Sequence, residues 1–394
     1  MASKLFTAGQ IGTLTLPNRV IRSATQDPFG RRDGTCAPEQ VELYREIAAA
    51  GTGAIITAYS YISPEARSTG IQVGFATPEQ RASQKEVLDA VHAAGGRLIL
   101  QLMHAGMNVF MPEKHVAGGK LLAPSSGMKA PNEMETTEIT AADREKIRND
   151  FVDAAKAAQE MGFDGIQLHC AHGYLLSQFL DPNTNHRTDE FGGSFENRCR
   201  FPLMVIEKVK SVLGCQVPLI LRLGADDFVP GSNTLEDAMA FAPLAEAKGV
   251  DLFNVTGGWH ETKVPQLTGD LPRGGLSYLG KGIRSVVSVP VMMCNRVSDP
   301  TTAEKLLALG RADLVGFGRP LIADPQLPNK ARENRAHEIR PCMACNQGCL
   351  ANTFFDRPIT CLVNGICGRE LQYPVVPAAQ PKKVLVIGGG PAGC

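Results

Sequence analysis

A short sequence pattern that recurs three times constrains the fold of this chain more than any other feature. It reads Glu-Met-Gly-Phe-Asp-Gly at residues 160–165, Ala-Lys-Gly-Val-Asp at 247–251 and Leu-Gly-Arg-Ala-Asp at 309–313. Each copy has the end of a helix, a glycine that caps it, and an acidic residue that opens an apolar strand. The repetition predicts an α/β fold in which helices alternate with buried strands.

The same alternation extends over most of residues 18–330. The predicted strands are Arg19–Ala24, Ala54–Ala58, Arg97–Leu102, Gly165–His169, Leu219–Leu223, Leu252–Thr256, Val289–Cys294 and Asp313–Phe317. Predicted helices between them include Pro38–Ala50, Ala141–Met161, Phe195–Leu213 and Leu235–Lys248. Eight strands within about 320 residues fit a (β/α)₈ TIM barrel, and a doubly wound parallel sheet is the alternative. We predict the barrel because polar residues recur at the C-terminal ends of nearly all these strands.

Composition excludes several classes of function. The 394 residues are 43% hydrophobic and 20% charged, and 40 Lys and Arg balance 40 Asp and Glu. The chain therefore lacks the basic excess that holds nucleic acid or an anionic membrane surface. Its apolar runs are far shorter than a membrane span, and its first residues lack the apolar core of a signal peptide. We expect a cytoplasmic protein without a nucleic-acid or membrane partner, and the oligomeric state is left open.

Two segments stand outside the strand–helix alternation. Residues 103–139 are long for a connection, which predicts a functional cover or an added hairpin. Residues 371–381 are rich in proline, as in a linker, and precede an apolar run at 384–387 and the motif Gly388-x-Gly390-x-x-Gly393. This motif opens a dinucleotide-binding fold, but the following helix and ribose-binding acid are absent. We expect the chain to stop just inside another domain, so that this tail alone binds no dinucleotide.

Four of the eleven cysteines have a spacing typical of metal ligands: Cys342-x₂-Cys345-x₃-Cys349-x₁₁-Cys361. Thiolates are soft ligands, which favour an iron–sulfur cluster or zinc. Structural zinc sites more often use paired short Cys-x-x-Cys knuckles. We therefore expect a [4Fe–4S] cluster, with zinc as the alternative, and interpret Cys367 as a buried thiol outside the set.

Residues 165–198 identify a family. They contain His169-x-x-His172-Gly173-Tyr174, then Gln-Phe-Leu, Asn-x-Arg-x-Asp and Gly-Gly-Ser, and the segment strongly resembles the Old Yellow Enzyme family of FMN-dependent oxidoreductases. Further matches are Asn18-Arg19-Val20, Gln101-Leu102-x-His104-x-Gly106, Arg222-Leu223, Asn295-Arg296 and Gly318-Arg319-Pro320.

The resemblance narrows within that family. The cysteine spacing, Gly258-Trp259-His260-Glu261 and Pro272-Arg273-Gly274 are similar to the iron–sulfur branch, which contains 2,4-dienoyl-CoA reductase, enoate reductases and trimethylamine dehydrogenase. We accordingly expect an FMN-binding TIM barrel over residues 1–335, a [4Fe–4S] segment over 336–370, and a linker with the start of an FAD/NAD(P)-binding domain over 371–394.

The resemblance implies a set of FMN-binding residues: Ala24, Thr25, Ala58, Gln101, Arg222, Arg296, Gly318 and Arg319. Residue chemistry agrees with these roles. An amide such as that of Gln101 both donates to and accepts from a pyrimidine edge. Arg222 carries a fixed charge suited to an anionic reduced flavin, and Arg319 offers charge-assisted donors to a phosphate. Gln26 is a candidate for tuning the flavin potential.

The resemblance also implies substrate-binding and catalytic residues. His169 and His172 would bind a substrate oxygen, Tyr174 would donate a proton, and His260 would be a second acid. A phenol with an ordinary pKa near 10 is protonated at pH 7, so it can donate to a developing carbanion. His104 is interpreted as structural. One departure is Met107, where the family usually has arginine.

The implied activity is ene reduction of a small-molecule substrate. Electrons from NAD(P)H would arrive through an FAD domain beyond residue 394, pass the cluster at the four cysteines, and reach FMN. Hydride from FMN would reduce the C=C bond of an enoyl- or dienoyl-CoA, an aromatic or polycyclic acyl-CoA, or an enoate. The alternatives are an amine dehydrogenase of the trimethylamine dehydrogenase type and a non-catalytic electron-transfer subunit. The sequence leaves open the choice of alkene and of NADH or NADPH.

Overall fold

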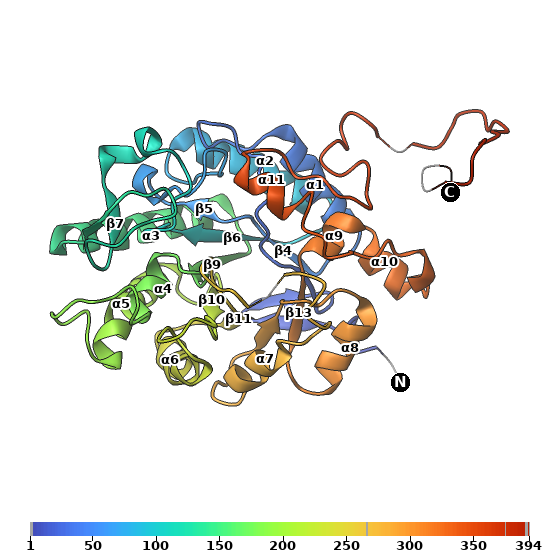
Figure 1. The fold of residues 1–394 in the computed structure, drawn as a ribbon. Coiled ribbons are helices and arrows are strands. Elements are labelled where there is room, and N and C mark those ends of the chain that lie inside the picture. Colours follow the sequence, from blue (N-terminus) through green and yellow to red (C-terminus); the bar gives the residue numbers. More distant parts are fainter. Residues whose placement is uncertain (1–2, 265–266, 375, 391–392, 394) are drawn as a thin grey trace.

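The computed structural model describes residues 3–264, 267–374, 376–390 and 393, and its centre is a closed barrel of parallel strands (Figure 1). The eight strands are β3 (Val20–Arg22), β4 (Ala54–Ile56), β6 (Leu98–Met103), β9 (Gly165–Cys170), β10 (Leu219–Gly224), β11 (Leu252–Thr256), β12 (Val291–Met293) and β13 (Leu314–Phe317). β4 pairs with both β3 and β6, and β13 pairs with β3, which closes the ring. The predicted TIM barrel is confirmed over the doubly wound sheet.

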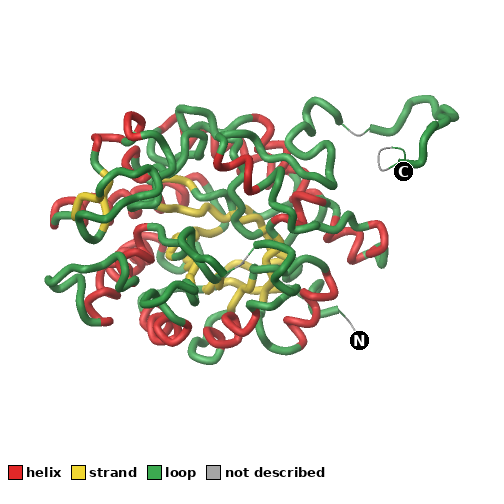
Figure 2. The backbone as a smooth tube through the Cα atoms, in the orientation of Figure 1, coloured by secondary structure: helices red, strands yellow, loops and turns green. Residues whose placement is uncertain are grey.

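Helices surround the barrel (Figure 2). The longer ones are α1 (Pro38–Ala49), α2 (Pro78–Ala93), α3 (Ala141–Met161), α5 (Phe195–Leu213), α6 (Leu235–Ala247), α7 (Ser277–Arg284) and α8 (Pro300–Ala308). The shorter ones are α4 (Leu175–Leu180), α9 (Arg319–Ala323), α10 (Leu327–Arg332) and α11 (Leu350–Phe354). The predicted bounds of α3 and α5 match at both ends because local caps set them: the Thr140 and Ser194 hydroxyls accept hydrogen bonds from the first turns.

The recurring helix–glycine–aspartate pattern has two structural consequences. Its glycines have the left-handed backbone of helix caps: Gly162 (φ 94°), Gly249 (φ 100°) and Gly310 (φ 62°). Each following aspartate accepts a hydrogen bond from the backbone N–H at the start of the preceding barrel strand. These pairs are Asp164 with Leu98, Asp251 with Leu219 and Asp313 with Val291. The pattern thus ties neighbouring strands together at the N-terminal end of the barrel.

Side chains inside the barrel change character along its axis. At the N-terminal end they form an apolar cluster, which the hairpin of β1 (Gly9–Ile11) and β2 (Leu14–Leu16) closes. The barrel-strand residues of this cluster are Ile21, Ala54, Ile56, Ile99, Ile220, Leu252, Met292 and Leu314. Because strand side chains alternate, residues two positions further on also point inward. These are polar or carry sulfur at Ser23, Gln101, Arg222, Asn254 and Cys294. The C-terminal end of the barrel is therefore the place for a polar ligand.

We expect the long connection after β6 to be a functional cover or an added hairpin, and its two strands do not form an antiparallel hairpin. Within it, β7 (Leu121–Ala123) and β8 (Thr136–Glu138) pair in parallel, because the chain between them makes its own turn around the bridge from Lys129 to Glu135. A short β5 (Ser60–Tyr61) extends the barrel sheet beside β6. Single turns of 3₁₀ helix lie at Pro64–Ala66, Glu113–His115, Ala117–Gly119 and Ala336–Glu338.

The C-terminal tail leads away from the barrel (Figure 1). The apolar run at residues 384–387 forms no strand, and its side chains are exposed, Ile387 to 91%. A strand of this kind is stabilised by parallel neighbours, and no described segment pairs with it. Its glycine motif lies partly outside the described residues. None of the helices built from described residues has the length and apolar character needed to cross a membrane.

Candidate active site

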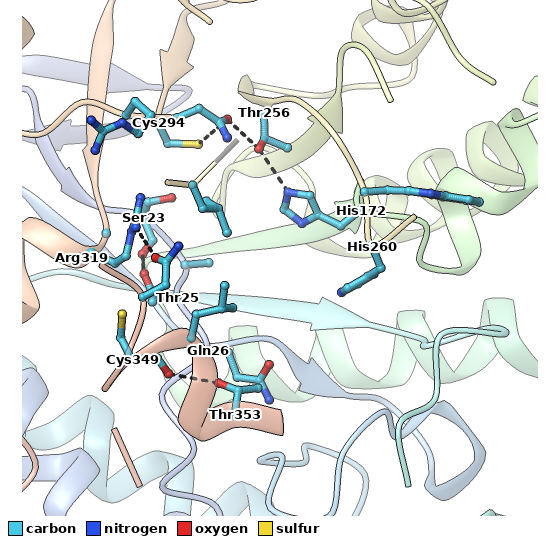
Figure 3. A pocket seen from close by; sticks show the side chains of 18 of the residues that line it. Ser23, Thr25, Gln26, His172, Thr256, His260, Cys294, Arg319, Cys349 and Thr353 are labelled. Atoms are coloured by element: carbon cyan, nitrogen blue, oxygen red, sulfur yellow. Dashed lines mark hydrogen bonds between the residues drawn. The ribbon is translucent and has the colours of Figure 1, made fainter. Parts of the chain in front are cut away.

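A cavity of about 600 Å³ opens at the C-terminal ends of the barrel strands (Figure 3). It brings together ten of the residues predicted to bind flavin or substrate: Ala24, Thr25, His169, His172, Tyr174, Arg222, His260, Arg296, Gly318 and Arg319. Two predicted flavin residues lie outside its lining. The backbone N–H of Ala58 already donates to the Tyr44 hydroxyl at 2.9 Å, and Gln101 is fully buried.

Several buried polar atoms at this end of the barrel have no hydrogen-bond partner. They are both amide atoms of Gln101, Nε of Arg222, Nδ1 of His169 and Oδ1 of Asn254. Buried polar atoms in proteins are nearly always paired, so a cluster of unpaired ones indicates a ligand. A flavin ring, which carries donors and acceptors along one edge, fits this mixed set.

The charged side chains that line the cavity are mostly cationic. Among the described lining residues, Arg222, Arg296, Arg319 and Lys263 carry positive charge, and Asp270 is the one acid. Arg296 donates to the carbonyl of Leu271 at 2.9 Å, and Arg319 donates to the Asn346 side chain. The remaining guanidinium donors can bind an anionic group such as a phosphate.

Tyr174 lies at the centre of a group of rings in the cavity. Its ring centroid is 4.8 Å from that of His169, 5.3 Å from His260 and 5.5 Å from Tyr59. Its hydroxyl hydrogen-bonds with Tyr59 and Ser68, and burial raises its pKa above the ordinary value of 10. Tyr174 therefore holds its proton at neutral pH.

The histidines of the site are neutral. Burial, reinforced by the nearby Arg222 charge, lowers the pKa of His169 and of His172 well below 6.5. The side chain of His260 lies at the open side of the cavity. Desolvation by the protein around its ring lowers its pKa to about 4. Neutral imidazoles bind a substrate oxygen by hydrogen bonding and not by charge.

A chain of hydrogen bonds fixes the orientation of His172 (Figure 3). The backbone N–H of Gly257 and the hydroxyl of Thr256 both donate to Oδ1 of Asn295, at 3.3 Å and 2.8 Å. The Thr256 oxygen is then free to accept, and Nε2 of His172 lies 3.1 Å away. Nε2 of His172 is therefore the protonated nitrogen, and Nδ1 carries the lone pair.

The turn between His172 and Tyr174 depends on glycine. Gly173 has φ 69°, and a Cβ atom there would lie 2.3 Å from the Trp259 ring. The amide of Asn108 donates to the carbonyls of His172 and, at a shorter distance, of Gly173. Asn108 thus anchors the connection after β6, in which Met107 replaces the usual arginine of the family.

Sequence reasoning missed several residues that line the cavity: Tyr59, Phe110, Thr256, Trp259, Asn295 and Phe354. Trp259 and Asn295 belong to quoted motifs, and their neighbours His260 and Arg296 were selected in their place. Phe110 and Phe354 carry no motif. Phe110 does show that the long connection covers part of the cavity, as expected.

The four predicted metal ligands surround a second, small cavity. Cys342, Cys345, Cys349 and Cys361 all line this space of about 20 Å³, together with Arg319. Cys342 and Cys349 also line the main cavity, so the two spaces adjoin. Among the described residues, no three histidine, cysteine or carboxylate side chains are placed to hold one metal ion. Cys367 is buried, as predicted, and outside the lining.

Three comparisons with known proteins indicate the same family. The family model of the NADH:flavin oxidoreductase / NADH oxidase family matches residues 4–338. A metal reductase from Desulforamulus reducens is 40% identical over 99% of this chain, and an N,N-dimethylglycine/sarcosine dehydrogenase from Chromohalobacter salexigens is 33% identical over 99%. A solved structure of 2-naphthoyl-CoA reductase superposes on 99% of the chain with a TM-score of 0.94 and 32% identity.

These relatives are longer than this chain, which spans 58%, 57% and 61% of their respective lengths. The family match, however, includes the barrel and every strand end that lines the cavity. The chain belongs to the NADH:flavin oxidoreductase / NADH oxidase family, that of Old Yellow Enzyme.

Proposed function

We propose that this protein is an FMN- and [4Fe–4S]-dependent ene-reductase that reduces the activated C=C bond of an enoyl- or dienoyl-CoA or an enoate. NAD(P)H is the ultimate electron donor, and an FAD domain outside this chain passes its electrons on. Bound FMN supplies the hydride, and the residues of the chain hold the substrate and provide the proton.

The observation that carries the proposal is the position and the protonation state of Tyr174. It lines the cavity, retains its proton because burial raises its pKa, and has two neutral histidines beside it. A positioned phenol is suited to protonate the carbon next to a substrate carbonyl. Hydrogen bonds from His169 would stabilise the negative charge that develops on the carbonyl oxygen.

The residues present fit FMN. Gln101 and Arg222 offer unpaired atoms for the polar edge of the ring, and Arg296 and Arg319 offer donors for the phosphate. Thr25 and Gly318 lie close together, since a Cβ on Gly318 would stand 2.9 Å from the Thr25 hydroxyl. A side chain at residue 318 would fill this space, so the glycine leaves room there for a ligand.

The four cysteines fit a cluster better than a single zinc ion. Zinc holds four thiolates at about 2.3 Å, which brings the sulfurs nearly into contact. The described cysteines share a cavity without that close grouping. A [4Fe–4S] cluster, whose four irons each take one thiolate, keeps its ligands further apart.

Amine dehydrogenation is the second candidate, because one relative bears such a name and aromatic rings line the cavity. Rings of this kind can hold an ammonium group. Among the described lining residues Asp270 is the one acid, and it lies on the exposed side, so the inner cavity offers an ammonium group no carboxylate. The scarcity of acids in the described lining favours the acyl substrate over the amine.

The test uses the chain itself and needs no NAD(P)H-binding residues. The protein is purified without oxygen, reconstituted with FMN, photoreduced and mixed with a 2-enoyl- or 2,4-dienoyl-CoA. We expect rapid return of oxidised-flavin absorbance together with the saturated thioester. If no CoA ester, enoate or enone reoxidises the flavin while an amine reduces it, the amine dehydrogenase is correct. If neither class reacts, the chain is an electron-transfer subunit.

A further inference from the structure

Four rings from distant parts of the chain form a continuous series in the lining of the cavity. Phe354 lies edge-on to Phe110 with centroids 5.8 Å apart, Phe110 to His260 at 5.2 Å, and His260 to Tyr174 at 5.3 Å. All four residues line the same cavity. The series therefore leads from the opening of the cavity to the proposed proton donor.

The outer rings of this series are unusually open for aromatic side chains. Phe354 is 56% exposed, Phe110 is partly exposed, and His260 is exposed on the cavity side. Exposed apolar rings in a concave site are typical of ligand contact and not of core packing. A flat conjugated ligand would cover them and gain edge-to-face contacts that an aliphatic chain cannot make.

We propose that Phe354, Phe110 and His260 form a ring platform that binds the aryl group of an aryl-conjugated acyl substrate. The proposal rests on the proposed ene-reductase function and names its substrate class. The acyl end of such a substrate reaches Tyr174, at the inner end of the ring series. The reacting double bond is then conjugated with the ring held by the platform.

The platform gives the cysteine-rich segment a second role. Phe354 lies on α11, which follows Cys349 directly, and Leu350 and Thr353 of the same helix also line the cavity. Figure 3 shows Thr353 and Cys349 on one side of the cavity and His260 on the other, with the Thr353 hydroxyl donating to the Cys349 carbonyl. The segment that carries the proposed cluster ligands thus also selects the substrate.

The test compares two substrates in each variant. The ratio of kcat/KM for a 3-arylacryloyl-CoA to that for a linear 2-enoyl-CoA with the same number of carbons is measured with dithionite-reduced protein. Phe354→Leu and Phe110→Leu should each lower this ratio by roughly three- to tenfold, the size of one aromatic contact. Phe355→Leu is the matched control, because Phe355 is 67% exposed, lies beside Arg357 and does not line the cavity.

A ratio unchanged in both platform variants, or lowered equally by Phe355→Leu, would overturn the proposal. Calorimetric binding of the saturated 3-arylpropionyl-CoA separates it from the proposed function. If the wild type binds this ligand and both platform variants bind it more weakly, but no alkene is reduced, the function is wrong and the platform stands. If alkenes are reduced without any effect of the platform variants, the platform is wrong and the function stands.

Discussion

Nε2 of His172 lies 3.1 Å from the hydroxyl oxygen of Thr256. Since Thr256 donates its own proton to Asn295, this contact makes His172 the donor and fixes its tautomer. Its lowered pKa keeps it in the neutral form at pH 7. His172 therefore presents a lone pair at Nδ1, and donation to a substrate oxygen falls to His169.

Replacing Thr256 with valine should disturb this arrangement without changing side-chain volume greatly. The loss of one hydrogen bond is worth about 1 kcal/mol, so reoxidation of reduced flavin by the alkene should slow roughly five- to tenfold. Thr256→Ser keeps the hydroxyl and should restore the rate. Nitrogen-15 NMR of labelled histidine should show a protonated Nε2 at His172 in the wild type and in Thr256→Ser. Equal rates for the valine and serine variants would contradict the role of Thr256.

Replacing Tyr174 with phenylalanine removes the proposed proton donor and retains the ring contacts. General acid catalysis contributes at least about a hundredfold, so alkene reduction should slow by that factor or more. Photoreduction of the flavin should remain within about twofold, since it does not need this proton. Stopped-flow absorbance measures both steps. A similar loss in both would mean that Tyr174 supports flavin binding and not proton transfer.

Replacing Cys349 with serine should abolish the cluster. Cys349 lines both cavities, and four thiolates are required for a stable [4Fe–4S] centre. Iron and acid-labile sulfide, measured after anaerobic purification, should fall to background. Cys367→Ser is the control, because Cys367 is buried within the same segment but lies outside the small cavity. One zinc per chain without labile sulfide in the wild type would establish the zinc alternative.

Replacing Arg319 with alanine should weaken the binding of FMN but not that of riboflavin, which has no phosphate. A charge-assisted contact is worth about 1.5–3 kcal/mol, so the Kd for FMN should rise roughly ten- to a hundredfold. Arg222→Met should weaken the binding of both flavins, because Nε of Arg222 is one of the unpaired atoms that we assign to the flavin ring. Fluorescence quenching on flavin binding gives both constants. If Arg319→Ala weakened riboflavin equally, Arg319 would not bind the phosphate.

Stability should fall in mild acid because of a buried neutral histidine. Burial lowers the pKa of His104 from 6.5 to about 4, and its Nδ1 accepts a hydrogen bond from Gly106. The unfolded chain therefore binds a proton below pH 6.5 that the folded protein does not bind until about pH 4. As the pH falls through that window, this group should lower the free energy of unfolding by about 1.4 kcal/mol per pH unit. Urea titrations of His104→Asn should show a shallower decrease, and an unchanged slope would contradict the assignment.

The parts of the fold that rest on local chemistry can be predicted from the sequence alone. Caps at Thr140 and Gly162 set the bounds of α3, and apolar strands with glycine–aspartate starts set the barrel. Such signals lie within a few residues of one another, so a single chain displays them. The family pattern around His169 and Tyr174 identified most of the cavity for the same reason.

Contacts between residues far apart in the sequence become visible only in the folded chain. Phe110 and Phe354 are 244 positions apart and share a ring contact, and Thr256 meets Asn295 across neighbouring strand ends. These contacts depend on how the barrel closes and how the loops cross it, which no local pattern records. The same holds for residues 384–387, since an apolar run becomes a strand only where partner strands exist to bond it.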